Sequence, residues 1–222
     1  MGLATYSIIF DLDGVLLDSE SDMSWMKKAL EDTLDYFHIE VTEDNLTKLD
    51  RKNLSKFPEI AAFFNINVKD LWKIRNYHYT KRKIEAIQTE QILLFPDVSA
   101  LYQFANSSEL AILSNSPQEV VDVFLKQFHL EKIFTAGIGR SDKYEDIFKL
   151  KPHPLLWQRL KPLLIGNTIF YVGDRTTDEI FAHKMKMKFF GLNRYQDLFN
   201  PGYSTLYEII NEINKIVYKK TN

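Results

Sequence analysis

The sequence lacks cysteine, long apolar runs and a strong excess of charge of either sign. Without cysteine, neither a disulfide framework nor a thiolate nucleophile is possible. Hydrophobic residues nevertheless make up 45% of the 222 residues and aromatic residues 14%. This composition argues against general disorder and is sufficient for a packed core. The length allows one large domain or a core with a smaller insert.

The other two absences bear on location and partners. No apolar run is long enough to span a bilayer, and the N-terminus shows no charged region followed by a long apolar region, so we expect no signal peptide. The net charge is only −2, so no global basic field recruits nucleic acid. We therefore expect a cytoplasmic protein without a membrane or nucleic-acid partner. The sequence leaves its oligomeric state open.

Two carboxylates stand directly after a short apolar run, in the stretch Asp11-Leu12-Asp13-Gly14. The preceding residues 6–10 have the apolar, β-branched character of a buried strand. Ligands bind at the carboxyl ends of parallel strands in open α/β sheets. Carboxylates this close stay ionised most easily if a cation lies between them or one keeps a proton. A simple Asp-Gly hairpin turn is the alternative interpretation of this stretch.

Three later segments carry polar residues suited to phosphate chemistry. The apolar residues 110–113 lead into Ser114-Asn115-Ser116, Lys151 precedes Pro152-His153-Pro154, and the apolar residues 169–172 lead into Gly173-Asp174-Arg175-Thr176-Thr177-Asp178. Each segment is a weak signal when taken alone, but their order along the chain gives them weight.

In this order the four segments resemble the motifs of the haloacid dehalogenase-like superfamily of phosphohydrolases. The resemblance extends from about Ser7 to Leu192. It implies an α/β fold, a Rossmann-like three-layer sandwich with a central parallel sheet, plus an inserted all-α cap domain. Within the superfamily it points to the phosphatase branch with a helical cap after the first motif, which includes phosphoglycolate phosphatases and β-phosphoglucomutase-like proteins.

The resemblance also implies roles for the first-motif aspartates. Asp11 would be the nucleophile, since a carboxylate needs no deprotonation at neutral pH and aspartyl-phosphates are established intermediates. Asp13 would protonate the leaving oxygen and later deprotonate water, which requires a raised pKa or a strong hydrogen bond that holds the proton. The carbon–halogen and phosphonoacetaldehyde branches lack an acid at the position of Asp13, so this residue favours phosphoryl transfer.

The remaining motif residues would hold a metal ion and the phosphate. Mg²⁺ would be bound by Asp11, the backbone carbonyl of Asp13, and Asp174, because hard oxygen ligands suit this ion. Asp178 would act as a direct or water-mediated ligand, or else only cap a helix. Phosphate would be bound by Ser114, Asn115 and Lys151, with the lysine also acting in catalysis as a positive charge beside Asp11.

The chain divides near Asp18 and again near Phe95-Pro96. We expect residues 1–17 and 95–222 to form the catalytic core and residues 18–94 to form the helical cap. In the cap region the apolar spacing predicts helices over about 21–38, 60–64 and 68–91. Beyond Pro96, strands alternate with helices, which predicts a parallel sheet with right-handed crossovers.

Several local expectations follow from single residues. Capping boxes are predicted at Ser116–Glu119 and Thr176–Glu179, and Asp97 is expected to cap a helix over about 99–106. A short strand is predicted at Ile133-Phe134. The charged stretch 139–150 makes the position of Lys151 the least secure of the motif residues.

The cap region offers aromatic and basic side chains near the expected site. Trp25, Trp72, Tyr77 and Tyr79 follow helical spacing, which is more typical of a core than of a substrate pocket. Arg51, Arg75 and Tyr77 are expected to be exposed on the cap and to recognise the leaving group. The five histidines show no metal-binding spacing.

We therefore predict a Mg²⁺-dependent phosphatase that acts on a small phosphorylated metabolite through an aspartyl-phosphate. One alternative is a phosphomutase of the β-phosphoglucomutase type, for which residues 51–55 match the expected Arg-x-x-Ser-type signature only loosely. The other alternative is a non-catalytic binding protein that retains the fold. The repulsive set of Asp11, Asp13, Asp174 and Asp178 argues against it, because a binding module has no need for such a cluster.

Overall fold

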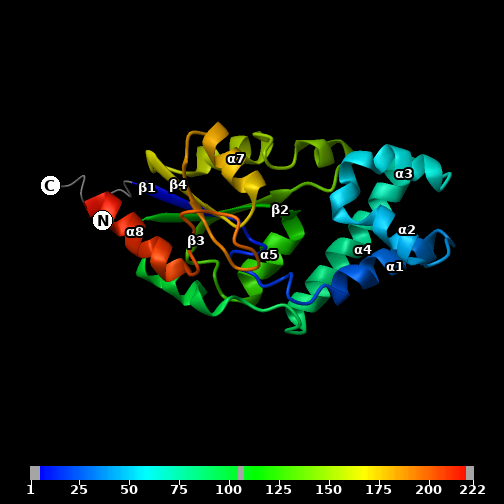
Figure 1. Ribbon diagram of the computed structural model, residues 1–222, viewed down its shortest axis with the longest axis horizontal. Coiled ribbons are helices and arrows are strands. Elements are labelled where there is room, and N and C mark those ends of the chain that lie inside the picture. The colour runs from blue at the N-terminus through cyan, green and yellow to red at the C-terminus, as the bar shows by residue number, and fades with distance from the viewer. Residues whose placement is uncertain (1–5, 105–107, 219–222) are drawn as a thin grey trace.

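The computed structural model describes residues 6–104 and 108–218 (Figure 1). A sheet of five parallel strands forms the centre, in the order β3-β2-β1-β4-β5. The strands are β1 (Tyr6–Phe10), β2 (Glu109–Pro117), β3 (Phe134–Arg140), β4 (Thr168–Gly173) and β5 (Lys188–Gly191). The strand order reverses beside β1, and ligands bind next to such reversals in open sheets.

Helices cover both faces of this sheet (Figure 1). On one face lie the α-helices α5 (Gln118–Gln127) and α8 (Leu206–Tyr218) and the 3-10 helix η2 (Pro96–Gln103); on the other lie α6 (Leu155–Leu160) and α7 (Thr176–Lys184). Two short 3-10 helices, η3 (Tyr144–Lys149) and η4 (Lys161–Leu163), complete this part of the chain. The predicted three-layer α/β sandwich is therefore confirmed.

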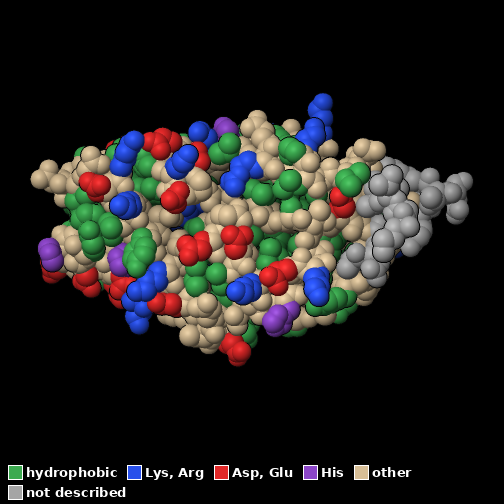
Figure 2. Space-filling model, turned by 180° about the vertical axis from the view of Figure 1, so that it is seen from behind, with side chains coloured by type: hydrophobic (Ala, Val, Ile, Leu, Met, Phe, Trp, Pro, Cys, Tyr) green, Lys and Arg blue, Asp and Glu red, His purple; other side chains and the backbone are tan. Residues whose placement is uncertain are grey.

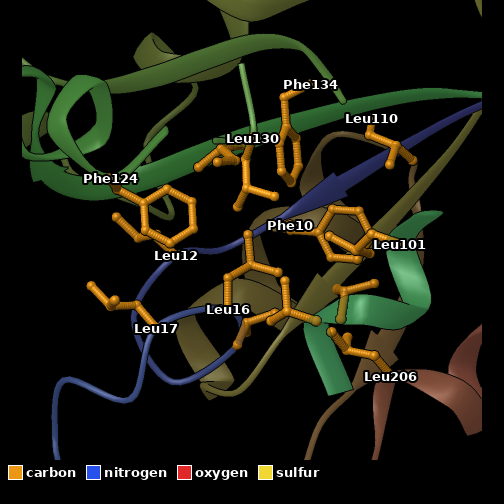
Figure 3. Close-up of a cluster of buried hydrophobic side chains, with 14 of the residues drawn as sticks. Phe10, Leu12, Leu16, Leu17, Leu101, Leu110, Phe124, Leu130, Phe134 and Leu206 are labelled. Atoms are coloured by element: carbon orange, nitrogen blue, oxygen red, sulfur yellow. The ribbon is translucent and has the colours of Figure 1, made fainter. Parts of the chain in front are cut away.

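Strand β1 shows why the sheet must be covered twice. Ile8 and Phe10 belong to the hydrophobic cluster on one face, while Ile9 belongs to the cluster on the other. All three are buried, as expected for a parallel strand with helices on both sides. Figure 3 shows Phe10 packed among Leu101, Leu110 and Phe134. This double burial fixes the strand that carries Asp11 and Asp13 at its end.

The stretch between β1 and η2 is helical. It contains α1 (Ser24–Tyr36), α2 (Glu43–Leu49), the 3-10 helix η1 (Arg51–Lys56), α3 (Phe57–Phe63) and α4 (Val68–Gln88). These elements gather beyond one end of the sheet (Figure 1). Most of their buried hydrophobic side chains form a second cluster, in which Leu34, Leu49 and Trp72 are fully buried or nearly so and which also includes Ile147 of η3.

The two connections to this helical stretch run side by side. Leu17 and Leu94 form an antiparallel bridge. The amide of Asp18 donates to Leu93 O at 2.9 Å, and the amide of Phe95 donates to Leu16 O at 3.1 Å. The chain thus leaves and re-enters the sheet-containing part through one paired crossing, at the positions where the sequence divides.

Some local predictions were wrong. Helix α5 begins at Gln118 without a side-chain cap, because β2 extends through Ser116 and directs that side chain elsewhere. Asp97 does not cap the helix predicted to follow it: it is buried and accepts hydrogen bonds from Arg194 and from the amide of Leu206, the first residue of α8. Asp97 lies within the 3-10 helix η2, and residue 106, the end of the predicted helix, lies outside the described residues.

The surface gives two further observations. Within residues 6–104 and 108–218, no helix combines the length and apolar character needed to cross a membrane. On the face seen in Figure 2, acidic and basic side chains are interspersed, with hydrophobic side chains between them.

The packing around β1 predicts a large loss of stability on truncation of Phe10. Phe10→Ala should lower the free energy of unfolding by about 3–5 kcal/mol, because the side chain is 1% exposed and its removal leaves a cavity. Urea denaturation measures this. Phe63→Ala is the matched control, since Phe63 is 64% exposed, and should change stability by only about 0.5 kcal/mol. Similar losses for the two variants would contradict the assignment of the core.

Candidate active site

The carboxyl ends of three neighbouring strands bring the predicted residues together. Asp11 follows β1, Ser114 lies in the last part of β2, and Asp174 follows β4. Lys151, from the segment between β3 and α6, joins them. All of these residues line one cavity of about 210 Å³, together with Asp13, Asn115 and Asp178. The residues that the sequence singled out therefore share one site.

Three carboxylates form the centre of the site. One oxygen from each of Asp11, Asp174 and Asp178 lies within 4.8 Å of the others. Burial raises the pKa of Asp11 to about 7 and that of Asp174 to about 8, and mutual repulsion adds to both. Oδ1 of Asp174 is buried and has no hydrogen-bond partner among the described residues. A divalent cation between these oxygens would relieve the repulsion and occupy the unpartnered oxygen, so the residues fit such an ion.

The turn after β1 explains the glycine of the first motif. Gly14 has a φ of +76°, a conformation that side chains rarely adopt. A Cβ at this position would also collide with the carboxylate of Asp174. Gly14 therefore allows the chain to turn while Asp174 approaches the end of β1.

Lys151 is the cation of this cluster. Its Nζ lies 2.9 Å from Asp11 Oδ1 and 2.6 Å from Asp178 Oδ1, and it donates to the hydroxyl of Tyr171 at 2.8 Å. Although burial opposes it, the attraction of Asp11 and Asp178 raises the pKa of Lys151 well above its ordinary value. The charged stretch before Lys151 does not displace it, because the side chain of Asn115 accepts a hydrogen bond from the Lys151 amide at 2.8 Å.

Asp13 lies outside the carboxylate cluster and has its own partners. Lys83 contacts Oδ1 of Asp13, Ser19 donates to the same oxygen at 2.6 Å, and Ser116 donates to Oδ2 at 2.6 Å. Burial alone would raise the pKa of Asp13, but Lys83 and the two hydroxyls lower it to about 2. Of the two conditions given for proton transfer by Asp13, a raised pKa is not met in this arrangement, because three donors stabilise the carboxylate.

Ser114 lies in the cavity as predicted, whereas Ser116 does not have the capping role expected of it. Ser114 is 1% exposed, and its hydroxyl accepts a hydrogen bond from the Ser116 amide at 3.1 Å. Ser116 does not begin a capping box, because its hydroxyl is used by Asp13 and Lys83.

Asp178 caps a helix, one of the roles considered from the sequence, and also pairs with Lys151. Its Oδ2 accepts a hydrogen bond from the Arg175 amide at 3.2 Å, so it caps the start of α7, while Oδ1 binds Lys151. The box predicted at Thr176–Glu179 is therefore not formed: Asp178 makes one of the two bonds of such a box, one residue earlier, and the Arg175 side chain cannot accept the other. Arg175 pairs with Glu20 and, at 3.2 Å, with Asp174.

The helical stretch contributes residues that sequence reasoning missed or misplaced. Lys83 of α4 is 1% exposed although it lies in a run of charged residues. Arg75 is also 1% exposed, which corrects its expected position on the surface. Tyr77 is exposed as expected, Arg51 is half-buried, and Arg51, Arg75 and Tyr79 line the cavity. Trp25 and Trp72 are core residues.

Comparisons with known proteins agree with this geometry. The family model for haloacid dehalogenase-like hydrolases matches residues 8–192. A search of curated proteins finds no match.

Several solved structures are similar in fold. A predicted phosphoglycolate phosphatase from Haemophilus somnus 129PT has a TM-score of 0.66 at 21% identity, over 96% of this chain and 100% of the other. A haloacid dehalogenase-superfamily hydrolase of subfamily IA from Geobacter sulfurreducens PCA has a TM-score of 0.58 at 20% identity, over 95% and 97%. CbbY from Rhodobacter sphaeroides in complex with phosphate has a TM-score of 0.61 at 16% identity, over 87% and 88%. At these identities the likeness shows a shared fold.

The carboxylate cluster predicts that Mg²⁺ stabilises the protein. An ion that binds only the folded state adds about 2.7 kcal/mol at 100 times its dissociation constant, so the thermal midpoint should rise with Mg²⁺. Asp174→Asn should lose most of this increase. Thermal unfolding with and without Mg²⁺ measures it, and an equal increase in the variant would contradict the assignment.

The same cluster predicts a pH dependence in metal-free buffer. Asp11 and Asp174 bind protons more tightly when folded, with pKa values of about 7 and 8 against 3.8 ordinarily. The free energy of unfolding should therefore decrease as the pH rises through this window, because the folded state holds more protons there. The increase in the free energy of unfolding on addition of Mg²⁺ should be larger at pH 8 than at pH 6, because at pH 6 the ion must displace those protons. Stabilisation by Mg²⁺ that decreases as the pH rises would contradict the proposed repulsion between the carboxylates.

Proposed function

The chain belongs to the haloacid dehalogenase-like hydrolase family, and from this premise we propose that it is a Mg²⁺-dependent phosphatase acting on small phosphorylated metabolites. The observation that carries the proposal is the position of Asp11 at the end of β1, with Lys151 Nζ 2.9 Å from its carboxylate and Ser114 lining the same cavity. A nucleophile, a cation for the phosphate and a set of metal ligands thus share one buried site.

Asp11 is the proposed nucleophile. A carboxylate oxygen of Asp11 attacks phosphorus, the bond from phosphorus to the ester oxygen breaks, and an aspartyl-phosphate forms. Water then attacks the phosphorus of this intermediate, which releases inorganic phosphate and restores Asp11. The amide of Leu12 donates to Asp11 Oδ1 at 2.8 Å, and Lys151 lies beside the same oxygen. These donors orient the carboxylate and leave Oδ2 as the attacking oxygen.

Asp11, Asp174 and Asp178, with the backbone carbonyl of Asp13, would hold the Mg²⁺ ion. When bound, the ion supplies positive charge that offsets the repulsion between the substrate phosphate and the carboxylates. Lys151 supplies charge from a second direction and neutralises Asp11 and Asp178 in part. Ser114 and the backbone amide of Asn115 are the proposed donors to the phosphate oxygens.

Asp13 is the proposed proton carrier. It donates a proton to the leaving oxygen in the first step and accepts one from water in the second. The contact with Lys83 favours the ionised form of Asp13, which suits the second step. For the first step Asp13 must hold a proton, which requires the Lys83 contact to loosen. Because Lys83 lies on α4, movement of the helical stretch would change the charge state of Asp13.

We assign residues 18–94 as a cap and residues 1–17 and 95–222 as the catalytic core. The paired crossing at Leu17 and Leu94 supports this division, as does a second hydrophobic cluster that consists mainly of residues from the helical stretch. Residues at such a crossing can absorb the dihedral changes of domain closure. The cavity of about 210 Å³ beneath the cap suits a small metabolite, and closure would exclude bulk water from the reaction.

Release of phosphate from p-nitrophenyl phosphate tests the proposed function. We expect Mg²⁺-dependent hydrolysis that EDTA abolishes and excess Mg²⁺ restores. Asp11→Asn should keep the fold and lose the activity, because an amide is a poor nucleophile. A screen of phosphorylated metabolites identifies better substrates. A phosphomutase would use the same groups and instead return a phosphorylated isomer. Full activity in EDTA, or in folded Asp11→Asn, would contradict the proposal.

Substitution of Asp13 separates the proton-transfer role from the nucleophile. Asp13→Asn should lower kcat by roughly 10²–10⁴-fold, the range typical of general acid–base catalysis. The loss should be smaller for p-nitrophenyl phosphate than for an alkyl phosphate, because the nitrophenolate leaves without a proton. Steady-state kinetics with both esters measures this difference. Equal losses would mean that Asp13 acts only through its backbone or the structure of the turn.

A further inference from the structure

Two arginines in the active-site cavity have no carboxylate partner among the described residues. Arg75 comes from α4 of the cap, and Arg140 is the last residue of β3 in the core. Both line the cavity that contains Asp11, and they are 1% and 5% exposed. Their burial and their placement on opposite sides of the cap–core boundary set them apart from ordinary surface arginines.

The other basic residues around the cavity are neutralised. Lys151 pairs with Asp11 and Asp178, and Lys83 pairs with Asp13. Arg175 and Arg51 both pair with Glu20. By contrast, Arg75 and Arg140 form no ion pair with residues in the described ranges 6–104 and 108–218. The carboxylates of the reaction centre therefore form their ion pairs with other cations and not with these two arginines.

The hydrogen bonds of the two guanidinium groups are incomplete. Nε of Arg75 donates to Leu49 O at 2.8 Å, but its buried Nη2 has no partner. Nη1 of Arg140 donates to Ser141 O at 3.1 Å. Both Cζ atoms lie near the ring of Tyr79, at 5.7 and 5.9 Å from its centroid. The Cζ atom of Arg140 also lies 5.0 Å from the centroid of Trp72. These aromatic rings offset only part of the cost of burying two positive charges.

We infer that Arg75 and Arg140 bind a second anionic group on the substrate, so that the preferred substrate is a small phosphate monoester whose leaving group carries a carboxylate or another phosphate. This inference rests on the proposed phosphatase function and specifies the substrate class of the same site. The reacting phosphate is placed beside Asp11 by Lys151 and Ser114, which leaves the two arginines for the distal group. An anion held by Arg75 from the cap and Arg140 from the core would also favour closure of the cap on this substrate.

Three esters with a three-carbon skeleton test the inference. Glycerol 3-phosphate ends in a neutral hydroxyl group, 3-phosphoglycerate ends in a carboxylate, and propane-1,3-diol bisphosphate ends in a second phosphate. We expect kcat/KM to be roughly 10- to 100-fold higher for at least one anionic ester, the range expected for hydrogen bonds to a charged group. The anionic ester with the larger increase in kcat/KM over glycerol 3-phosphate identifies the distal group as carboxylate or phosphate.

Substitutions test whether the two arginines cause the preference for anionic esters over glycerol 3-phosphate. Arg75→Gln and Arg140→Gln should each remove most of the preference, mainly through KM, and leave hydrolysis of glycerol 3-phosphate nearly unchanged. Arg75→Lys should restore part of it. Lys73→Gln is the matched control, because it removes an exposed positive charge from the same helix and should leave the preference intact. Circular dichroism checks that each variant is folded.

Three results would overturn the inference. One is a wild-type enzyme that hydrolyses the neutral and anionic esters equally well, and this result does not depend on any variant. The second is an equal loss for all three esters in folded Arg75→Gln and Arg140→Gln, which would show a structural role alone. In both cases phosphatase activity would stand. The third is absence of hydrolysis of these esters and of p-nitrophenyl phosphate, which would reject the proposed function as well.

Discussion

The contact of one buried lysine with two aspartates holds this site together. Lys151 joins Asp11, at the end of β1, to Asp178, in the first turn of α7. Without a positive charge, three carboxylates within 4.8 Å of one another could not all be ionised in a buried site. Lys151 neutralises part of this charge, and the remaining excess favours a divalent cation. The parallel sheet matters because it brings the ends of β1, β2 and β4 to this one lysine.

A second ion pair links the reaction centre to the cap. Lys83 crosses from α4 to Asp13 and also donates to Ser116 at 2.9 Å. The proposed proton carrier is therefore stabilised as a carboxylate by a residue of the proposed cap. In the proposed mechanism, opening and closing of the cap are therefore coupled to substrate entry and to the protonation of Asp13. A ligand shifts the population toward whichever of the open and closed states it binds more tightly. The unpaired Arg75 and Arg140 are the proposed source of such an affinity for an anionic leaving group.

The sequence predicts the sheet and its motifs because these depend on local patterns. Short apolar runs ending in Asp11, Ser114 and Asp174 indicate strands that converge at one edge. The partners of Asp13 could not be predicted, since Lys83 lies 70 residues away in the sequence and its helix has charged residues on more than one face. The capping prediction at Ser116 failed because a tertiary hydrogen bond to Asp13 outweighs a local one. Burial of Arg75 likewise depends on how the cap packs, which periodicity does not specify.

Chemical trapping of the intermediate tests the central proposal, that Asp11 is the nucleophile, most directly. The enzyme is quenched during turnover with Mg²⁺ and substrate, reduced with borohydride and digested for mass spectrometry. An aspartyl-phosphate is reduced to homoserine, whereas a free carboxylate is not. We predict homoserine in place of Asp11 only when substrate and Mg²⁺ are both present. Unchanged Asp11 during demonstrated turnover, or homoserine at another aspartate, would contradict the account.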